Sequence, residues 1–304
     1  MGAVTSKELY TSPPVDLTLS PLPDLAGQIQ LFLSSEARSA QNDTLFAISF
    51  GFWDVYNLAS LDYELAQNMT DAAVDHLVYQ INILYSHYTE DFYNRTANEN
   101  ATTSDPPPFQ LVIPRLFDPT LVPGWLSQHA TPPSPSTVAE QQKQAVYLAQ
   151  RWNSRLENAL GSWVADGADA EGDETNELGA SDPAANETVV ISQVELPRKD
   201  IFYYDLPQFV LDIMVERQME NAGQSDAAGL GKGQSPFTSI SEPCLRKGSA
   251  EQEGDGDGVR NTVCAEPQSY LFWDEFNLGG AANEGIGKKI AGMIKEGSRI
   301  GGSA

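Results

Sequence analysis

The sequence predicts an α/β domain in which a parallel β-sheet carries helices on both faces. Two short apolar runs, Leu45–Phe50 and Phe109–Ile113, have the length and composition of strands buried on both sides. Each is followed by a long segment with helical apolar spacing, and alternation of strands with helices is typical of parallel sheets. The 304 residues, 41% of them hydrophobic, suffice for one such domain.

The first half of the chain alternates between the two kinds of element. A Pro-rich stretch precedes a predicted short helix at Asp24–Leu33. The first strand ends at Gly51, and a long helix is expected to start at Thr70 or Asp71. Its apolar positions are Val74, Leu77, Val78, Ile81, Leu84, Tyr85 and Tyr88. A polar loop over 94–108 leads to the second strand, which Pro114 ends.

The second half repeats the alternation less clearly. The capping-box sequence Thr137-Val-Ala-Glu140 predicts the start of a long helix. Thr188–Ile191 is expected to form a third strand, and Phe202–Asp205 a turn or strand entry before a helix. The remaining expectations are a helix over 209–215, a polar loop over 219–262, a short apolar element at 270–274 and a helix over 281–294.

The strand ends and the chain's acidity limit the possible functions. Ligands of parallel sheets bind beyond the carboxyl ends of strands, so loops starting at Gly51, Pro114 and Trp273 are the candidate site. The net charge of −24 argues against nucleic acid and anionic membranes as partners. Acidic stretches near 166–187 and 251–257 are expected to be solvated loops. No apolar stretch is long enough to span a membrane.

Five Asn-X-Thr sequons favour a secretory-pathway protein; they begin at Asn42, Asn68, Asn94, Asn100 and Asn186. The two cysteines, Cys244 and Cys264, are either buried thiols or a disulfide, and secretion favours the disulfide. The N-terminal residues lack the basic start and apolar run of a signal peptide. Either the protein is intracellular, or its signal lies upstream of this sequence.

The segment from Cys264 to Asn283 resembles the last conserved block of secreted, fungal-like GDSL-type (SGNH) esterases and acylhydrolases. That block contains a cysteine, then Tyr/Phe-Trp-Asp, then Asp-x-x-His before a helix. Asp274 matches the catalytic Asp, and Asn277 stands at the His position. In the family the Asp orients the imidazole that deprotonates a serine, and an amide does not accept a proton near neutral pH. Alternatively, Asp274 is a turn carboxylate.

Two further segments resemble blocks that form the family's oxyanion hole. Leu45–Asp54 is similar to the Gly-x-Asn-Asp block, with Gly51 and Asp54 aligned and Trp53 at the position of the Asn. The family's Asn donates to the oxyanion, so Trp53 either donates through its indole or packs under the loop, and packing is favoured. The start of the chain resembles the family's second block, and the resemblance makes Gly2 the counterpart of a glycine whose backbone N–H lines the same hole.

The resemblance covers residues 2–295, a single flavodoxin-like domain with an acidic insert at 164–187 and a flexible tail at 296–304. It includes no Gly-Asp-Ser nucleophile block. The resemblance therefore implies that the first strand or strands, the nucleophile and a signal peptide are missing upstream. Because the missing first strand is interior in the family, the chain is expected to expose a sheet edge and to associate or be poorly soluble.

Two functions remain open at this stage. One is an ester hydrolase acting on a small-molecule or polysaccharide ester or a lipid ester, incomplete and inactive as written. The other is a non-catalytic secreted glycoprotein of the same fold that binds a glycan, lipid or protein partner. No cofactor or metal is expected. The histidines lack a ligand pattern, and the calcium-like loop at Glu253–Gly258 has Cys264 at the position that requires Glu.

Overall fold

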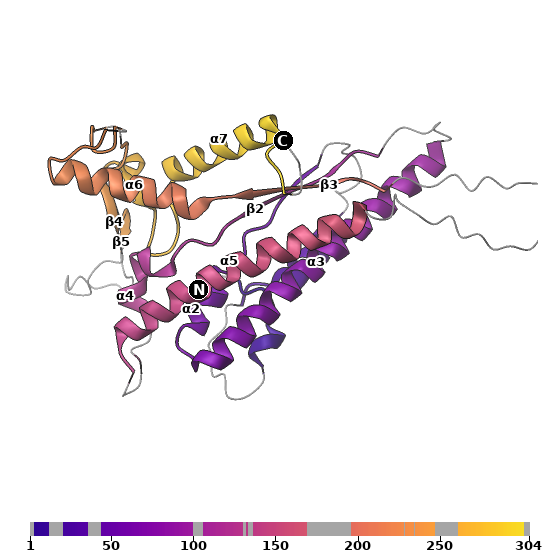
Figure 1. The fold of residues 1–304 in the computed structure, drawn as a ribbon, viewed down its shortest axis with the longest axis horizontal. Helices are drawn as coiled ribbons and strands as arrows, with labels where there is room; N and C mark the ends of the chain where they lie inside the picture. Colours follow the sequence, from indigo (N-terminus) through magenta and orange to yellow (C-terminus); the bar gives the residue numbers. More distant parts are fainter. Residues whose placement is uncertain are drawn as a thin grey trace, which may run out of the picture.

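In a computed structural model the chain forms a mixed α/β structure around small parallel sheets (Figure 1). The structure describes residues 3–11, 21–35, 44–99, 106–129, 132, 136–168, 196–227, 229–233, 235–246 and 261–300. Residues 164–168, expected to begin the acidic loop insert at 164–187, are helical instead. Gly2, the rest of that insert and the expected strand at 188–191 lie outside the described residues.

The largest sheet has three parallel strands in the order β1-β2-β3. They are β1 (Leu45–Ala47), β2 (Phe109–Pro114) and β3 (Lys199–Tyr204). Helix α3 (Tyr63–Glu99) connects β1 to β2, and α5 (Val138–Ala168) lies on the path from β2 to β3. The expected α/β class is confirmed. Each parallel pair is joined through a long helix, as parallel connections require.

The strands alternate their side chains between two faces. Phe46, Leu111 and Ile201 are in register and face the core formed with α3 and α5, where Leu77, Ile81, Leu148 and Leu156 are buried. The opposite face at the β3 end packs against α7 (Gly280–Glu296) through Tyr204 and Ala282. Figure 1 shows α7 on one side of the sheet and α3 with α5 on the other.

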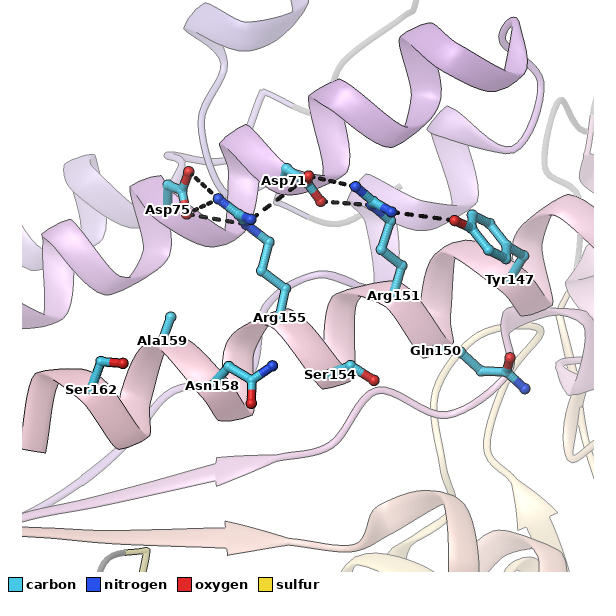
Figure 2. Close-up of a pocket in the computed structure, with 10 residues that line it drawn as sticks. All are labelled: Asp71, Asp75, Tyr147, Gln150, Arg151, Ser154, Arg155, Asn158, Ala159 and Ser162. Carbon is cyan, nitrogen blue, oxygen red and sulfur yellow. Dashed lines mark hydrogen bonds and ion pairs between the residues drawn. The ribbon is translucent and has the colours of Figure 1, made fainter.

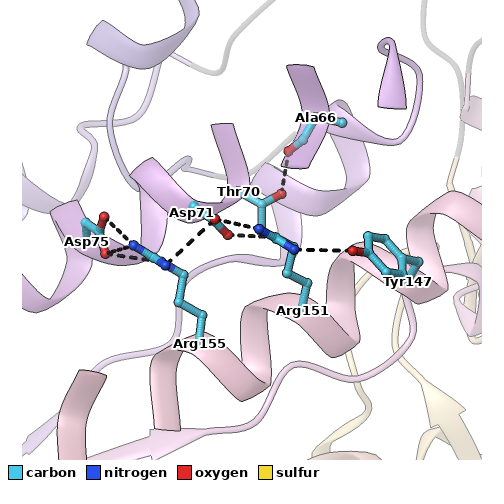
Figure 3. A network of polar contacts seen from close by, with 7 residues as sticks. All are labelled: Ala66, Thr70, Asp71, Asp75, Tyr147, Arg151 and Arg155. Atoms are coloured by element: carbon cyan, nitrogen blue, oxygen red, sulfur yellow. Dashed lines mark hydrogen bonds and ion pairs between the residues drawn. The ribbon is translucent and has the colours of Figure 1, made fainter. Parts of the chain in front are cut away.

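Ion pairs join α3 to α5 along their exposed sides (Figure 3). Arg151 donates from Nε and Nη2 to the two carboxylate oxygens of Asp71, each at 2.7 Å. One turn further, Arg155 donates to both oxygens of Asp75 at 2.7 Å. These bidentate contacts fix the register of the two helices, although exposed ion pairs stabilise a fold only slightly.

Several predicted boundaries differ from the observed ones. Helix α3 begins before Thr70, because the Asp62 carboxylate accepts from the backbone N–H of Glu64 at 3.0 Å and so caps the helix. The capping box at α5 is confirmed: Glu140 N–H donates to Thr137 Oγ1, and Thr137 N–H donates back to the Glu140 carboxylate. Helix α3 also continues to Glu99, into the expected loop.

Strand β3 is the element that the sequence predicts least clearly, because the strand begins with two charged residues. The Asp200 side chain is only 3% exposed and pairs with Arg198 and Arg299. Pairing offsets the cost of burying the Asp200 carboxylate in the sheet. The Ile300 N–H also donates to the Ile201 carbonyl at 2.9 Å, so Ile300 is packed against β3, although the sequence predicted a flexible tail at 296–304.

The remaining elements lie beyond this sheet. They are η1 (Glu8–Tyr10), α1 (Leu25–Leu33), α2 (Phe52–Leu58), η3 (Pro119–Leu121), α4 (Gly124–Gln128), α6 (Leu206–Asn221), β4 (Ser239–Pro243), β5 (Leu245–Arg246), β6 (Thr262–Val263), η5 (Pro267–Ser269) and β7 (Tyr270–Phe272). Strand β4 pairs with β7 in parallel, and β5 with β6 in antiparallel. The expected loop over 219–262 therefore contains strands and the end of α6.

The Cys244–Cys264 disulfide is confirmed, with the two Cα atoms 4.8 Å apart. It joins the β5 and β6 ends, next to the Cys264 N–H that donates to the Cys244 carbonyl at 2.9 Å. Among the helices that the structure describes, none has the length and apolar character of a bilayer span.

Candidate functional site

Gly51 sits at the turn between β1 and α2, the first of the loops that the sequence singled out. Its φ of 106° lies in the left-handed region that favours glycine. A Cβ at this position would meet the indole of Trp152 at 2.5 Å. The turn therefore needs glycine for two reasons, its backbone conformation and the close approach of α5.

Asp54 is fully buried in the first turn of α2. Its carboxylate accepts from the backbone N–H of Thr5 at 3.0 Å, the hydroxyl of Thr5 at 2.8 Å and the hydroxyl of Tyr10 at 2.9 Å. Burial raises the pKa of this carboxyl, although its hydrogen bonds oppose the shift. Asp54 therefore ties the N-terminal segment to α2.

Asp274 and Asn277 form one hydrogen-bonded turn after β7. Oδ1 of Asp274 accepts from the backbone N–H of Phe276 at 2.9 Å and of Asn277 at 2.8 Å. The Asn277 side-chain amide donates to both carboxylate oxygens, at 3.0 and 2.9 Å. The structure thus brings together the side chains of Asp274 and Asn277, the two residues that the sequence singled out in this segment. The Asn277 amide nitrogen donates to the carboxylate and has no lone pair available to take a proton.

The two predicted loops meet through aromatic side chains. The rings of Trp53 and Phe276 lie 4.8 Å apart between centroids, and Trp53 also packs on Phe52 and Tyr56. Gly124 at the start of α4 secures the second loop, because its N–H donates to the Glu275 carbonyl at 2.8 Å. A Cβ on Gly124 would meet the Phe276 ring at 2.6 Å, so this contact also requires a glycine.

Three residues near this junction were not singled out as site residues from the sequence. The ring of His129 stacks on Trp125 at 4.2 Å and contacts the ring of Tyr56 at 4.8 Å. His129 Nε2 donates to the Tyr56 carbonyl at 3.0 Å. Burial, with a smaller contribution from the Glu275 charge, raises the pKa of Tyr56 to about 12. In the sequence, only the aromatic residues within 52–56 and at position 125 indicate this cluster.

A separate hollow of about 680 Å³ lies over α3 and α5 (Figure 2). Its lining residues are Asp71, Asp75, Tyr147, Gln150, Arg151, Ser154, Arg155, Asn158, Ala159 and Ser162. None of the predicted site residues lines it. The two arginines point at the α3 carboxylates and are engaged there, so the hollow presents a neutralised polar surface.

The predicted modification sites are described only in part. Asn68 and Asn94 are exposed on α3, whereas Asn42, Asn100 and Asn186 lie outside the described residues. Within the described ranges, no group of three or more His, Cys, Asp and Glu side chains could hold a metal ion.

Comparisons with known proteins add no relative. No protein-family model matches the sequence, and no curated protein matches it significantly. The geometry of the Trp53–Phe276 junction is therefore the basis for a functional proposal.

Proposed function

We propose that this chain is a secreted, SGNH-like glycoprotein that binds an ester-bearing glycan or lipid and does not hydrolyse it. The observation that carries the proposal is the contact between Trp53 and Phe276, with ring centroids 4.8 Å apart. It joins the loop after β1 to the Asp274–Asn277 turn, the two segments that resemble the SGNH site blocks.

The sheet supports a flavodoxin-like assignment. Its strands are parallel and are connected through helices, and Gly51 begins α2 after β1, at the end of a sheet where ligands of open α/β folds bind. Aromatic rings and an amide–carboxylate pair are suited to a sugar or acyl ligand, because they offer flat apolar faces beside hydrogen-bonding groups.

The Asp274–Asn277 pair favours binding over hydrolysis. Serine acyl transfer needs a base that takes the hydroxyl proton and later returns it to the leaving group. Asn277 cannot do this, and its amide is already committed to the Asp274 carboxylate at 2.9 Å. The disulfide and the exposed sequons at Asn68 and Asn94 are compatible with secretion.

Calorimetric titration with acetylated oligosaccharides and with a short-chain triacylglycerol tests the binding function. We expect one ligand class to bind, and Trp53→Phe to weaken the binding because the phenyl ring is smaller and lacks the indole N–H. The control is Tyr79→Phe, since Tyr79 is an exposed aromatic on α3 away from the junction. Binding that survives Trp53→Phe unchanged, or no binding of either class, would contradict the proposal.

An assay with p-nitrophenyl acetate and butyrate distinguishes the alternative, ester hydrolysis. The wild-type chain and the Asp274→Asn variant are expected to show equal, background turnover. Turnover in the wild-type chain that Asp274→Asn abolishes would instead identify an active hydrolase whose proton acceptor is a residue other than Asn277.

A further inference from the structure

Asn68 is an exposed residue of α3, one turn before the carboxylates that line the hollow over α3 and α5. Asn68 and Asp75 are seven residues apart, which is nearly two helical turns, so they lie on the same side of the helix. The helical rise places Asn68 about 4.5 Å along the axis from Asp71 and about 10.5 Å from Asp75. A group attached to Asn68 therefore emerges beside the hollow.

The threonine of the sequon Asn68-Met-Thr70 is inaccessible in the folded protein. Thr70 is fully buried, and its hydroxyl donates to the Ala66 carbonyl at 2.8 Å (Figure 3). The enzyme that modifies sequons needs this hydroxyl and an extended backbone, and neither is available once α3 has formed. A sugar on Asn68 is therefore attached before α3 folds, and the chain folds with the sugar in place.

The hollow offers hydrogen-bonding side chains that the protein itself does not use. Its exposed polar side chains on α5 are those of Gln150, Ser154, Asn158 and Ser162 (Figure 2). Within the described part of the chain, these four side chains form no hydrogen bond or ion pair. Amides and hydroxyls both donate and accept, so they match the hydroxyl and acetamido groups of a sugar.

The charges that line the hollow cancel. Its two arginines are held by its two aspartates through bidentate contacts, so the lining is neutral although the whole chain carries −24. An anionic ligand would have to compete with these carboxylates for the arginines. A neutral ligand leaves the ion pairs intact, which favours an uncharged sugar over a phosphate or a carboxylate.

An aromatic pair lies at the start of the hollow on α5. The rings of Tyr63 and Tyr147 have centroids 5.3 Å apart, and Tyr63 is 49% exposed. The hydroxyl of Tyr147 accepts from Arg151 at 3.3 Å, which fixes this ring against the ion pairs. Exposed tyrosine rings give a flat apolar surface on which the C–H face of a sugar packs.

We propose that this chain carries an N-linked glycan on Asn68 and that the first sugars of the glycan lie in the hollow over α3 and α5. The inference rests on the secretion included in the proposed function. In the attachment, a bond forms between Asn68 Nδ2 and the sugar. The sugar's bond to its lipid diphosphate carrier breaks, the carrier keeps the electron pair, and the amide loses a proton. Because the glycan is tethered, weak contacts act at a high effective concentration.

Enzymatic release of glycans from the folded protein tests the proposal. An added signal peptide directs the whole chain through the secretory pathway of a eukaryotic cell, and mass spectrometry follows each sequon. Asn94 is the matched control, because it is exposed on the same helix about 39 Å along the axis from Asn68. A glycan-releasing amidase is expected to act roughly tenfold more slowly at Asn68 than at Asn94, and equally at both after unfolding.

Variants of α5 separate contact with the hollow from the local structure of α3. Gln150→Ala and Asn158→Ala remove exposed side chains of the lining, so the fold is expected to tolerate them. Each is expected to speed release at Asn68 several-fold and to leave release at Asn94 unchanged. Lys143→Ala is the control, because Lys143 is exposed on α5 and does not line the hollow.

Three results would overturn the proposal. They are an Asn68 without a glycan in the secreted protein, equal release from Asn68 and Asn94 in the folded wild type, and Lys143→Ala speeding release at Asn68 as much as Asn158→Ala. The ligand titration that tests the proposed function concerns the Trp53–Phe276 junction, which shares no residue with the hollow. The inference and the proposed function therefore fail by different measurements.

Discussion

The hydroxyl of Tyr10 donates to the carboxylate of Asp54 at 2.9 Å inside the protein, across 44 positions of sequence. With the two hydrogen bonds from Thr5, this contact holds the segment before α1 against the first turn of α2. The resemblance placed Asp54 at an oxyanion-hole block, and the structure gives it three donors from the N-terminal segment. Asp54 is therefore a structural carboxylate on which the Gly51 loop depends.

Loss of the Asp54 carboxylate is expected to destabilise the fold. Asp54→Ala leaves the buried Thr5 and Tyr10 donors without an acceptor, which costs roughly 2–5 kcal/mol of unfolding free energy. Tyr10→Phe removes one donor and is expected to cost about 1–2 kcal/mol. Urea unfolding followed by circular dichroism measures both. The interpretation fails if Asp54→Ala costs no more than Tyr10→Phe.

The stability should depend on pH through Asp54. Burial raises the pKa of Asp54 in the folded state, so the folded protein binds this proton more tightly than the unfolded chain. Its stabilising contribution is complete below the unfolded pKa of about 3.9 and is lost as pH rises through the folded value. The unfolding free energy of wild type relative to Asp54→Asn is therefore expected to fall with rising pH above about 4. A difference that rises with pH would contradict this.

Gly51→Ala is expected to be strongly destabilising. The new Cβ would lie 2.5 Å from the Trp152 ring at a φ of 106°, so packing strain and backbone strain add to roughly 2–5 kcal/mol. Gly161→Ala is the control, because Gly161 lies in α5 with no atom within 4 Å of the added Cβ. That substitution should stabilise the protein by up to about 1 kcal/mol. Thermal unfolding of both variants makes the comparison.

Asp200→Asn is expected to release the C-terminal segment from β3. The variant keeps the size of the side chain but weakens its contacts with Arg198 and Arg299, at 2.8 and 3.0 Å. Hydrogen exchange at the Ile300 amide, which donates to Ile201, is expected to accelerate, with a loss of roughly 2–4 kcal/mol in unfolding free energy. The Asp75→Asn variant, which alters an exposed ion pair, should change stability by less than about 1 kcal/mol.

The candidate site was predictable only as separate pieces. Local sequence identified the Gly51 turn and the Asp274–Asn277 turn, and both turns exist. It did not reveal that Trp53 lies on Phe276, or that His129 and Trp125 complete the cluster. The Trp53–Phe276 and Tyr56–His129 contacts join residues more than 70 positions apart, and no short pattern encodes which aromatic side chains meet.

The sequence by itself determined the elements whose signal is local. Residue spacing alone predicts the apolar runs at β1 and β2, the Thr137 capping box and the periodic apolar faces of α3 and α5. These patterns do not depend on which layer packs against them. Only the tertiary structure decided that charged β3 is a strand, because Asp200 needs Arg198 and Arg299 before it can be buried. It also decided that Asp54 faces Tyr10, since a buried carboxylate is stable only where the folded chain supplies its donors.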